Sequence, residues 1–163
     1  MELRINSVAE KPFYEDGLRF SCRRCSLCCR QDEGFVFLTK NDADVLSAAV
    51  ALRYEEFIQV YCRWVKLGGG VELLCLKEKT NNDCCFWKDG CSVYHTRPLQ
   101  CRSYPFWKNF LADKKLWDKA LSDCPGVGVG ELHSKASIEA WIQSEDAEPV
   151  IQRRHRRLQP CLE

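Results

Sequence analysis

The segment Cys22-Arg23-Arg24-Cys25-Ser26-Leu27-Cys28-Cys29 carries four of the 12 cysteines of this 163-residue chain. Two residues between cysteines let a loop turn so that both sulfurs face one centre, about 2.3 Å away for zinc. Zinc usually takes such ligands two by two, whereas three thiolates at this spacing are typical of the iron–sulfur clusters of bacterial ferredoxins. Adjacent cysteines cannot easily direct both sulfurs at one small ion, so bonding geometry allows Cys29 to serve a neighbouring centre.

A second group of cysteines follows much later in the chain, at Cys85, Cys91 and Cys101, with a remote Cys124-Pro125 beyond it. Together with the first four they make eight thiolates. Eight are enough for two four-cysteine sites, and they would equally serve one cluster plus functional thiols. The register of one ligand is ambiguous, because Cys84 directly precedes Cys85.

Arginines lie beside these cysteines in the sequence, and the net charge of a metal centre with eight thiolates suggests that they compensate it. Eight thiolates around two zinc ions, or around two cubanes of charge +2, would leave a net charge of about −4. We expect Arg97 and Arg102 to compensate this charge and to donate N–H···S bonds, with Tyr94 of the same segment beside them.

The remaining cysteines and glycines have simpler interpretations. Cys62 is predicted on the apolar face of a helix and Cys75 inside an apolar strand, both as inert core residues. Cys161 is expected to be a free thiol. His95 is interpreted as a loop histidine near the site. The glycines of 126–130 are predicted to form a plain turn, because they lack the spacing of a nucleotide-binding loop.

Composition excludes several classes of protein. Apolar residues make up 45% and charged residues 29% of the chain, and the net charge of +1 offers no field that recruits nucleic acid or membrane. The charged N-terminus lacks the apolar run of a signal peptide. We therefore expect a cytoplasmic protein, in a reducing compartment where clustered thiols bind metal more often than they form disulfides.

The elements expected from periodicity and the cysteine pattern together predict a small α+β, loop-rich single domain organised around a cysteine metal cluster. A strand is expected at 35–38, a helix capped by Thr39, a second helical stretch from Phe57 through Val65, a strand at 71–76, and a last helix capped by Ser134. The predicted division is an N-terminal extension at 1–19, the metal-binding domain at 20–145 and a basic C-terminal tail at 146–163. That tail contains arginines at 153–157, which are interpreted as a solvated segment.

The ordered motif from Cys22 to Cys124 resembles the CxxCxxCC cysteine-cluster family, the YkgJ-like zinc- or iron-chelating domains. The resemblance rests on C-x2-C-x2-C-C, then Cys85-x5-Cys91-x2-Tyr94-x2-Arg97-Pro98-x2-Cys101-Arg102, and Cys124-Pro125-Gly126, and it spans roughly residues 20–145. It implies a cytoplasmic metal-binding domain with eight ligands, at Cys22, Cys25, Cys28, Cys29, Cys85, Cys91, Cys101 and Cys124. Ser26 departs from the pattern, because the family often has glycine there.

The sequence thus predicts a metal-binding protein that holds an iron–sulfur cluster, of the [4Fe–4S] type, or zinc. No catalytic residue is predicted. A protein partner is compatible with this prediction, whereas membrane and nucleic acid are not expected partners. Two alternatives stay open: a methyltransferase-related enzyme, by distant resemblance to flagellin lysine methylases, and a zinc-stabilised adaptor or RNA-binding module.

Overall fold

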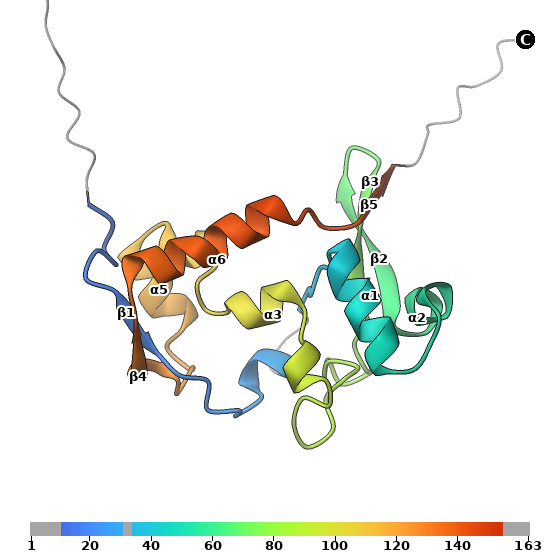
Figure 1. The fold of residues 1–163 in the computed structure, drawn as a ribbon, viewed down its shortest axis with the longest axis horizontal. Helices are drawn as coiled ribbons and strands as arrows, with labels where there is room; N and C mark the ends of the chain where they lie inside the picture. Colours follow the sequence, from blue (N-terminus) through green and yellow to red (C-terminus); the bar gives the residue numbers. More distant parts are fainter. Residues whose placement is uncertain (1–10, 31–33, 155–163) are drawn as a thin grey trace, which may run out of the picture.

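The computed structural model describes residues 11–30 and 34–154, and Figure 1 shows their arrangement. A three-stranded antiparallel sheet has the order β2 (Cys62–Gly68), β3 (Val71–Leu76), β5 (Gln152–Arg154). Helices α1 (Lys40–Ala49) and α2 (Tyr54–Tyr61) pack beside it. The first hydrophobic core lies here and includes Leu38, Leu46, Phe57 and Leu74, each at most 1% exposed.

A second hydrophobic core lies at the other end of the view in Figure 1. Strand β1 (Leu18–Phe20) pairs antiparallel with β4 (Val127–His133), and helices α4 (Lys108–Leu111), α5 (Lys114–Ala120) and α6 (Lys135–Ala147) complete this end. Its buried members are Phe20, Phe106, Leu111, Trp117, Leu121 and Ile138. The described chain therefore has two cores rather than one.

The cysteine-rich segments occupy the region between these cores. It contains the 3₁₀ turns η1 (Leu27–Cys29) and η2 (Tyr94–Thr96) and the short helix α3 (Leu99–Ser103). Cysteines contribute to both sides, since Cys84, Cys85 and Cys91 pack against the first core and Cys124 packs against the second. The small α+β fold expected from the sequence is confirmed, with the cysteines gathered in its middle.

Helix α1 begins where its sequence predicts. The Thr39 hydroxyl accepts a hydrogen bond from the Asp42 N–H, and the Asp42 carboxylate accepts one from the Thr39 N–H, both at 3.1 Å. This reciprocal capping box satisfies two N–H groups that the first turn leaves without helical partners.

Residues 35–38 join the first sheet only partly. Leu38 N–H donates to Leu74 O at 3.1 Å and Leu76 N–H donates to Val36 O at 2.9 Å, so the segment is bridged to β3 rather than forming a full strand.

The second helix is shorter than its apolar spacing predicts. It ends at Tyr61, and Cys62–Gly68 forms β2, which pairs with β3 from Cys62↔Leu76 to Gly68↔Val71. Trp64 and Val65 favour a strand, and the glycines at 68–70 adopt positive φ, so they close a hairpin. Cys62 is consequently a strand residue, although it is buried as expected, at 6% exposure.

The glycines at 126–130 also differ from the prediction of a plain turn. They lie in and beside β4, whose register with β1 shifts at Phe20. A Cβ on Gly126 would meet Ser21 O at 2.6 Å, and a Cβ on Gly130 would clash with Ser21 Oγ. Glycine is needed because the backbones approach closely, which periodicity does not reveal.

Both predicted flanking segments contain residues that join the fold. Phe13 and Tyr14 pack against the second core, while Gln152–Arg154 adds β5 to the first sheet. The division at 19/20 and 145/146 stays a prediction, and residues 1–10 and 155–163 lie outside the described residues. Among the residues described, no helix combines the length and the apolar character that crossing a membrane requires.

Candidate metal centre

The first cysteine segment (residues 22–29) and the second cysteine segment (residues 84–101) meet in space. Cys84 N–H donates to Cys29 O at 2.8 Å, which joins backbones more than fifty positions apart in the sequence. Next to this bond, Arg30 Nε lies 3.3 Å from Asp83 Oδ1, and the Arg30 guanidinium stacks 4.0 Å from the Trp87 ring centroid. The convergence that the sequence analysis requires is therefore present.

A cavity of about 480 Å³, which we call the thiol cavity, lies at this junction. Five of the predicted ligands line it: Cys22, Cys25, Cys28, Cys101 and Cys124. They come from the first segment, from α3 and from the loop before β4. The thiol cavity thus collects sulfurs from three separate parts of the chain.

A second, smaller grouping surrounds the Cys28–Cys29 pair. A space of about 40 Å³ is lined by Cys28, Cys29 and Cys84, so Cys28 borders both spaces. Cys85 follows Cys84 directly, and Cys91 forms an isolated bridge with Trp87. The predicted ligands therefore fall into two neighbouring sets, with Cys28 between them.

Each pair of adjacent cysteines contains one thiol that ionises readily. The Cys28 and Cys29 sulfurs lie 3.9 Å apart, and the hydrogen bond from Cys29 lowers the pKa of Cys28 to about 7 while that of Cys29 rises. In the same way, the hydrogen bond from Cys85 lowers the pKa of Cys84 to about 7, and the pKa of Cys85 rises. Because the thiolate is the ligand form, Cys28 and Cys84 present ready donors near neutral pH.

Other thiols of the group are protonated until a cation displaces the proton. Burial raises the pKa of Cys101 and of Cys91, and the neighbouring thiols Cys84 and Cys28 add to this. The Arg97 guanidinium acts in the opposite direction on both. Metal binding at these residues would accordingly release protons.

The predicted arginines stand beside the sulfurs. Arg97 and Arg102 both line the thiol cavity. Arg97 Nε donates to the backbone oxygen of Tyr94 at 2.8 Å, and Arg102 Nε donates to the backbone oxygen of Arg97 at 3.1 Å, so the backbone of this segment holds both guanidinium groups. The Tyr94 ring has the guanidinium carbons of Arg97 and Arg24 at 3.7 and 4.2 Å from its centroid. These contacts leave positive charge next to the thiols.

The first cysteine segment turns through two left-handed residues. Arg24 has φ 55° and Ser26 has φ 63°, one on either side of Cys25. This conformation suits glycine, because an L side chain crowds the following carbonyl. It gives a physical reason for the glycine that the family often has at the position of Ser26.

Tyr104 belongs to the surroundings of the thiols but was not predicted from the sequence. It lines the thiol cavity, and burial together with the neighbouring Cys124 thiol raises its pKa. Aromatic residues are frequent between 104 and 117, so the sequence alone marks none of them as a neighbour of sulfur.

Cys62, Cys75 and His95 do not line the thiol cavity. Cys62 and Cys75 are buried, and burial raises the pKa of Cys62 to about 12. His95 is exposed, and its ring stacks edge-on to Tyr94. Cys161 lies outside the described residues.

The donor set fits a thiophilic metal or cluster. The eleven cysteines in the described residues are all free thiols. Within the described residues no three His, Cys, Asp or Glu side chains already stand as a metal-binding group. The buried Nε1 of Trp87, in the second segment, has no hydrogen-bond partner in the described part of the chain. An N–H donor of this kind suits a thiolate or sulfide acceptor.

Comparison with protein families gives a match over residues 21–125, to the CxxCxxCC model described as a "putative zinc- or iron-chelating domain". This range contains all eight predicted ligands and most of the chain. The chain belongs to the CxxCxxCC family. Residues 21–125 are therefore a domain of the zinc- or iron-chelating type, as the motif predicted. No solved structure matches the chain.

Proposed function

We propose that this CxxCxxCC domain binds a [4Fe–4S] cluster in the thiol cavity, through four of its five cysteines. Cys22, Cys25 and Cys28 provide three thiolates at ferredoxin-like spacing. The fourth comes from Cys101 or Cys124, which line the same space. Such a cluster accepts and donates single electrons at a potential set by its surroundings.

The observation that carries this proposal is the size and lining of the thiol cavity. A four-cysteine zinc site needs little more than the ion itself, with sulfurs about 2.3 Å away. The thiol cavity has a volume of about 480 Å³ and five sulfurs at its edge. Its dimensions favour a polynuclear cluster over one zinc ion.

The arginines support an anionic centre at this place. Four thiolates around a cubane of charge +2 leave a net charge of about −2. Arg23, Arg97 and Arg102 line the cavity and can offset it. Burial on one side and guanidinium groups on the other tune the reduction potential of such a centre.

Exposure favours a redox role over a purely structural one. Cys22, Cys25 and Cys28 are exposed, whereas Cys101 and Cys124 are half-buried. A cluster held between them would be accessible at one edge, where a redox partner could exchange electrons. Electron transfer or redox sensing is the role that this arrangement supports.

A structural zinc ion is the second candidate, at the other set of cysteines. Cys29, Cys84, Cys85 and Cys91 lie away from the thiol cavity, and the Cys84 N–H to Cys29 O bond fixes two of them together. Four thiolates leave no open position on zinc, so this site would hold the first cysteine segment against the first core.

The RNA-binding alternative depends on the basic segment 153–157, and Arg153 of this segment is engaged in contacts within the fold. Arg153 Nε donates to Glu72 at 2.5 Å, and the guanidinium stacks 4.2 Å from the Trp64 ring centroid. The other arginines of that segment, apart from Arg154, lie outside the described residues. No observation on the described residues favours methyl transfer over metal binding.

The test is anaerobic purification from an iron-replete host, with iron, sulfide and zinc measured per chain. The proposal predicts a brown protein with equal amounts of iron and acid-labile sulfide, and an EPR signal after reduction. Cys25→Ser should remove the iron and sulfide, whereas Cys62→Ala, in the first core, should retain both. A colourless protein with stoichiometric zinc alone would overturn the cluster proposal in favour of the zinc site.

A further inference from the structure

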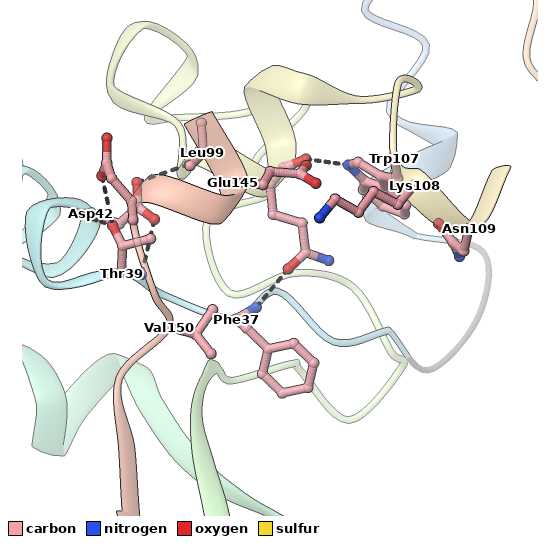
Figure 2. A pocket seen from close by; sticks show the side chains of 11 residues that line it. Phe37, Thr39, Asp42, Leu99, Trp107, Lys108, Asn109, Glu145 and Val150 are labelled. Carbon is pink, nitrogen blue, oxygen red and sulfur yellow. Dashed lines mark hydrogen bonds between the residues drawn. The ribbon is translucent and has the colours of Figure 1, made fainter. Parts of the chain in front are cut away.

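A second cavity, which we call the acidic cavity, lies on the other side of α3 from the thiol cavity. It has a volume of about 440 Å³ and is walled by α3, α6, the start of α1 and the residues around Trp107 (Figure 2). Trp107 lines both cavities, and Cys101 of the thiol cavity adjoins Gln100, which lines this one. None of its residues belongs to the predicted ligands.

Apolar groups form much of its wall. In the view of Figure 2 the Phe37 ring and Val150 lie across the cavity from Glu145 and Trp107. Leu99 lies on the same side as Glu145, towards Asp42. Phe37 and Trp107 are only half-buried, so parts of their rings remain accessible. Accessible aromatic rings in a concave site bind the apolar stem of a ligand and attract cations to their faces.

Two carboxylates supply the polar part of the site. Glu145 accepts a hydrogen bond from the fully buried Ser103 hydroxyl at 2.6 Å, and Trp107 Nε1 donates to that hydroxyl at 3.1 Å. Glu148 accepts from the Thr39 hydroxyl at 3.3 Å. These neutral donors hold each carboxylate in place and leave the second oxygen of each available.

Among the described residues that line the cavity, Lys108 is the one basic side chain. Neither Glu145 nor Glu148 forms an ion pair with any described residue, and the Lys108 ammonium at the rim pairs with Asp146 instead. The third carboxylate, Asp42, has both oxygens engaged by backbone N–H groups of Thr39 and Leu99. The cavity lining therefore carries three carboxylates against one ammonium group, a net negative charge.

The position of these two carboxylates at the C-terminal end of α6 destabilises the protein when no cation is bound beside them. Glu145 lies in the last turn of α6 and Glu148 follows as its C-cap, and that turn has no basic residue. The C-terminus of a helix carries partial negative charge and favours cations. A cationic occupant would relieve both the repulsion between the carboxylates and their conflict with the helix dipole.

The shape and lining select an organic cation over a metal ion. Two available carboxylate oxygens fall short of the six to eight oxygens that Ca²⁺ takes, and a space of about 440 Å³ is far larger than one ion needs. We propose that the acidic cavity binds an ammonium or guanidinium group on an apolar stem, with the charge at Glu145 and Glu148 and the stem against Phe37 and Trp107.

The shared wall gives this site a connection to the thiol cavity. Gln100 Oε1 accepts from Phe37 N–H at 2.9 Å, and Gln100 O accepts from Trp107 Nε1 at 2.9 Å, so residues of the acidic cavity are bonded to the helix that carries Cys101. A ligand that contacts Trp107 in the acidic cavity therefore contacts a residue that also lines the thiol cavity. Binding itself does not depend on which metal the thiol cavity holds, so this proposal and the cluster proposal can fail separately.

The test uses the full chain, purified with its metal, and the indole N–H signal of Trp107 in ¹H–¹⁵N spectra. Butylamine and agmatine serve as free cations, Gly-Lys-Gly and Gly-Arg-Gly as the same groups on a peptide, and butanol as a neutral analogue. We expect saturable shifts of the Trp107 signal with the cations. The tighter arm of free amine against peptide identifies the natural source of the group.

The variants decide whether the two carboxylates are responsible. Glu145→Gln with Glu148→Gln should weaken binding by about tenfold or more, the loss expected for a charge-assisted hydrogen bond. Glu148→Gln alone should give a smaller loss, and it serves if the double variant fails to fold. Glu139→Gln, on the same helix but outside the cavity, should bind as the wild type does.

Four results would overturn the proposal. They are the absence of any shift with millimolar cations, equal binding of butanol, unchanged binding by the double variant, and a response to Ca²⁺ that the organic cations do not produce.

Discussion

Ser26 holds a left-handed backbone in the middle of the first cysteine segment, at φ 63°. Serine is a poor choice for this conformation and a β-branched residue is worse. Together with Arg24, which has φ 55°, Ser26 therefore influences how easily Cys25 and Cys28 face the same centre.

We predict that Ser26→Gly raises the free energy of unfolding by up to about 1 kcal/mol, and that Ser26→Val lowers it by about 1–2 kcal/mol. Urea denaturation measures both, and metal content should follow the same order. Ser122→Gly is the control, because Ser122 is exposed and has no positive φ. A valine variant as stable as the wild type would contradict the assigned turn.

The role of Tyr104 beside the thiols can be tested directly by measuring a reduction potential. Its hydroxyl is close enough to the Cys124 thiol for that thiol to raise its pKa, and donors to sulfur stabilise the more negative, reduced state of a cluster. Tyr104→Phe removes this donor and keeps the ring that packs on Phe20 and Trp107.

We expect Tyr104→Phe to shift the reduction potential by about 40 mV in the negative direction, which corresponds to about 1 kcal/mol for one electron. A spectroscopic redox titration measures the shift. Tyr94→Phe is the matched control, because its ring is retained between Arg24 and Arg97. Equal potentials for Tyr104→Phe and the wild type would remove Tyr104 from the site.

At the scale of elements, strand β4 shows how a secondary-structure element positions a ligand loop. Gly130 lies against Ser21, the residue before Cys22, and the Ser21 hydroxyl accepts from Glu131 N–H at 3.0 Å. Gly128 has nearly the same φ, 77° against 78°, yet nothing stands within 4 Å of a Cβ placed on it.

Alanine at these two glycines separates backbone strain from crowding. Gly128→Ala should cost about 1 kcal/mol from its positive φ alone. Gly130→Ala should cost a further 1–3 kcal/mol or so, because it displaces Ser21, and it should also lower metal content. Unfolding by denaturant gives both values, and equal losses for the two variants would show that the close approach is unimportant.

The elements also show which parts of the fold local sequence can specify. The capping box at Thr39 depends on two residues only three positions apart, which a local sequence pattern contains. Its prediction is confirmed. The spacing from Phe57 to Val65 suits a helix and a half-buried strand alike, and only the pairing of Cys62–Gly68 with β3 decides between them. Gly126 and Gly130 are required by contact with Ser21, more than a hundred positions earlier, which no local pattern contains.

At the scale of the whole molecule, the cysteines join two hydrophobic cores. The sequence predicted that the two cysteine segments converge, because thiolates at such spacing need a common centre, and the structure brings them together. It could not predict that Cys28 borders two spaces, or that Cys124 packs with the second core, because these depend on how the cores are placed. The identity of the eight ligands stays a prediction.

Removal of the metal should therefore loosen the junction more than either core. A ligand bound at a thousand times its dissociation constant contributes about 4 kcal/mol. Each 1 kcal/mol moves the melting temperature of a chain this size by about 2–4 °C, so chelation should lower it by about 10 °C.

Hydrogen exchange locates this effect. The amide of Cys84, which donates to Cys29 O, should lose protection in chelator, while the amides paired between β2 and β3 keep most of theirs. Uniform loss across both cores, or no loss at Cys84, would contradict a junction held by metal.

The most direct measurement of the central claim is anomalous diffraction from crystals of the anaerobically purified chain, recorded at the iron and zinc edges. We predict an anomalous peak bound at about 2.3 Å by sulfurs from residues 22–29 together with the sulfur of Cys101 or Cys124. A metal held by one cysteine segment alone, or located away from both, would contradict the account.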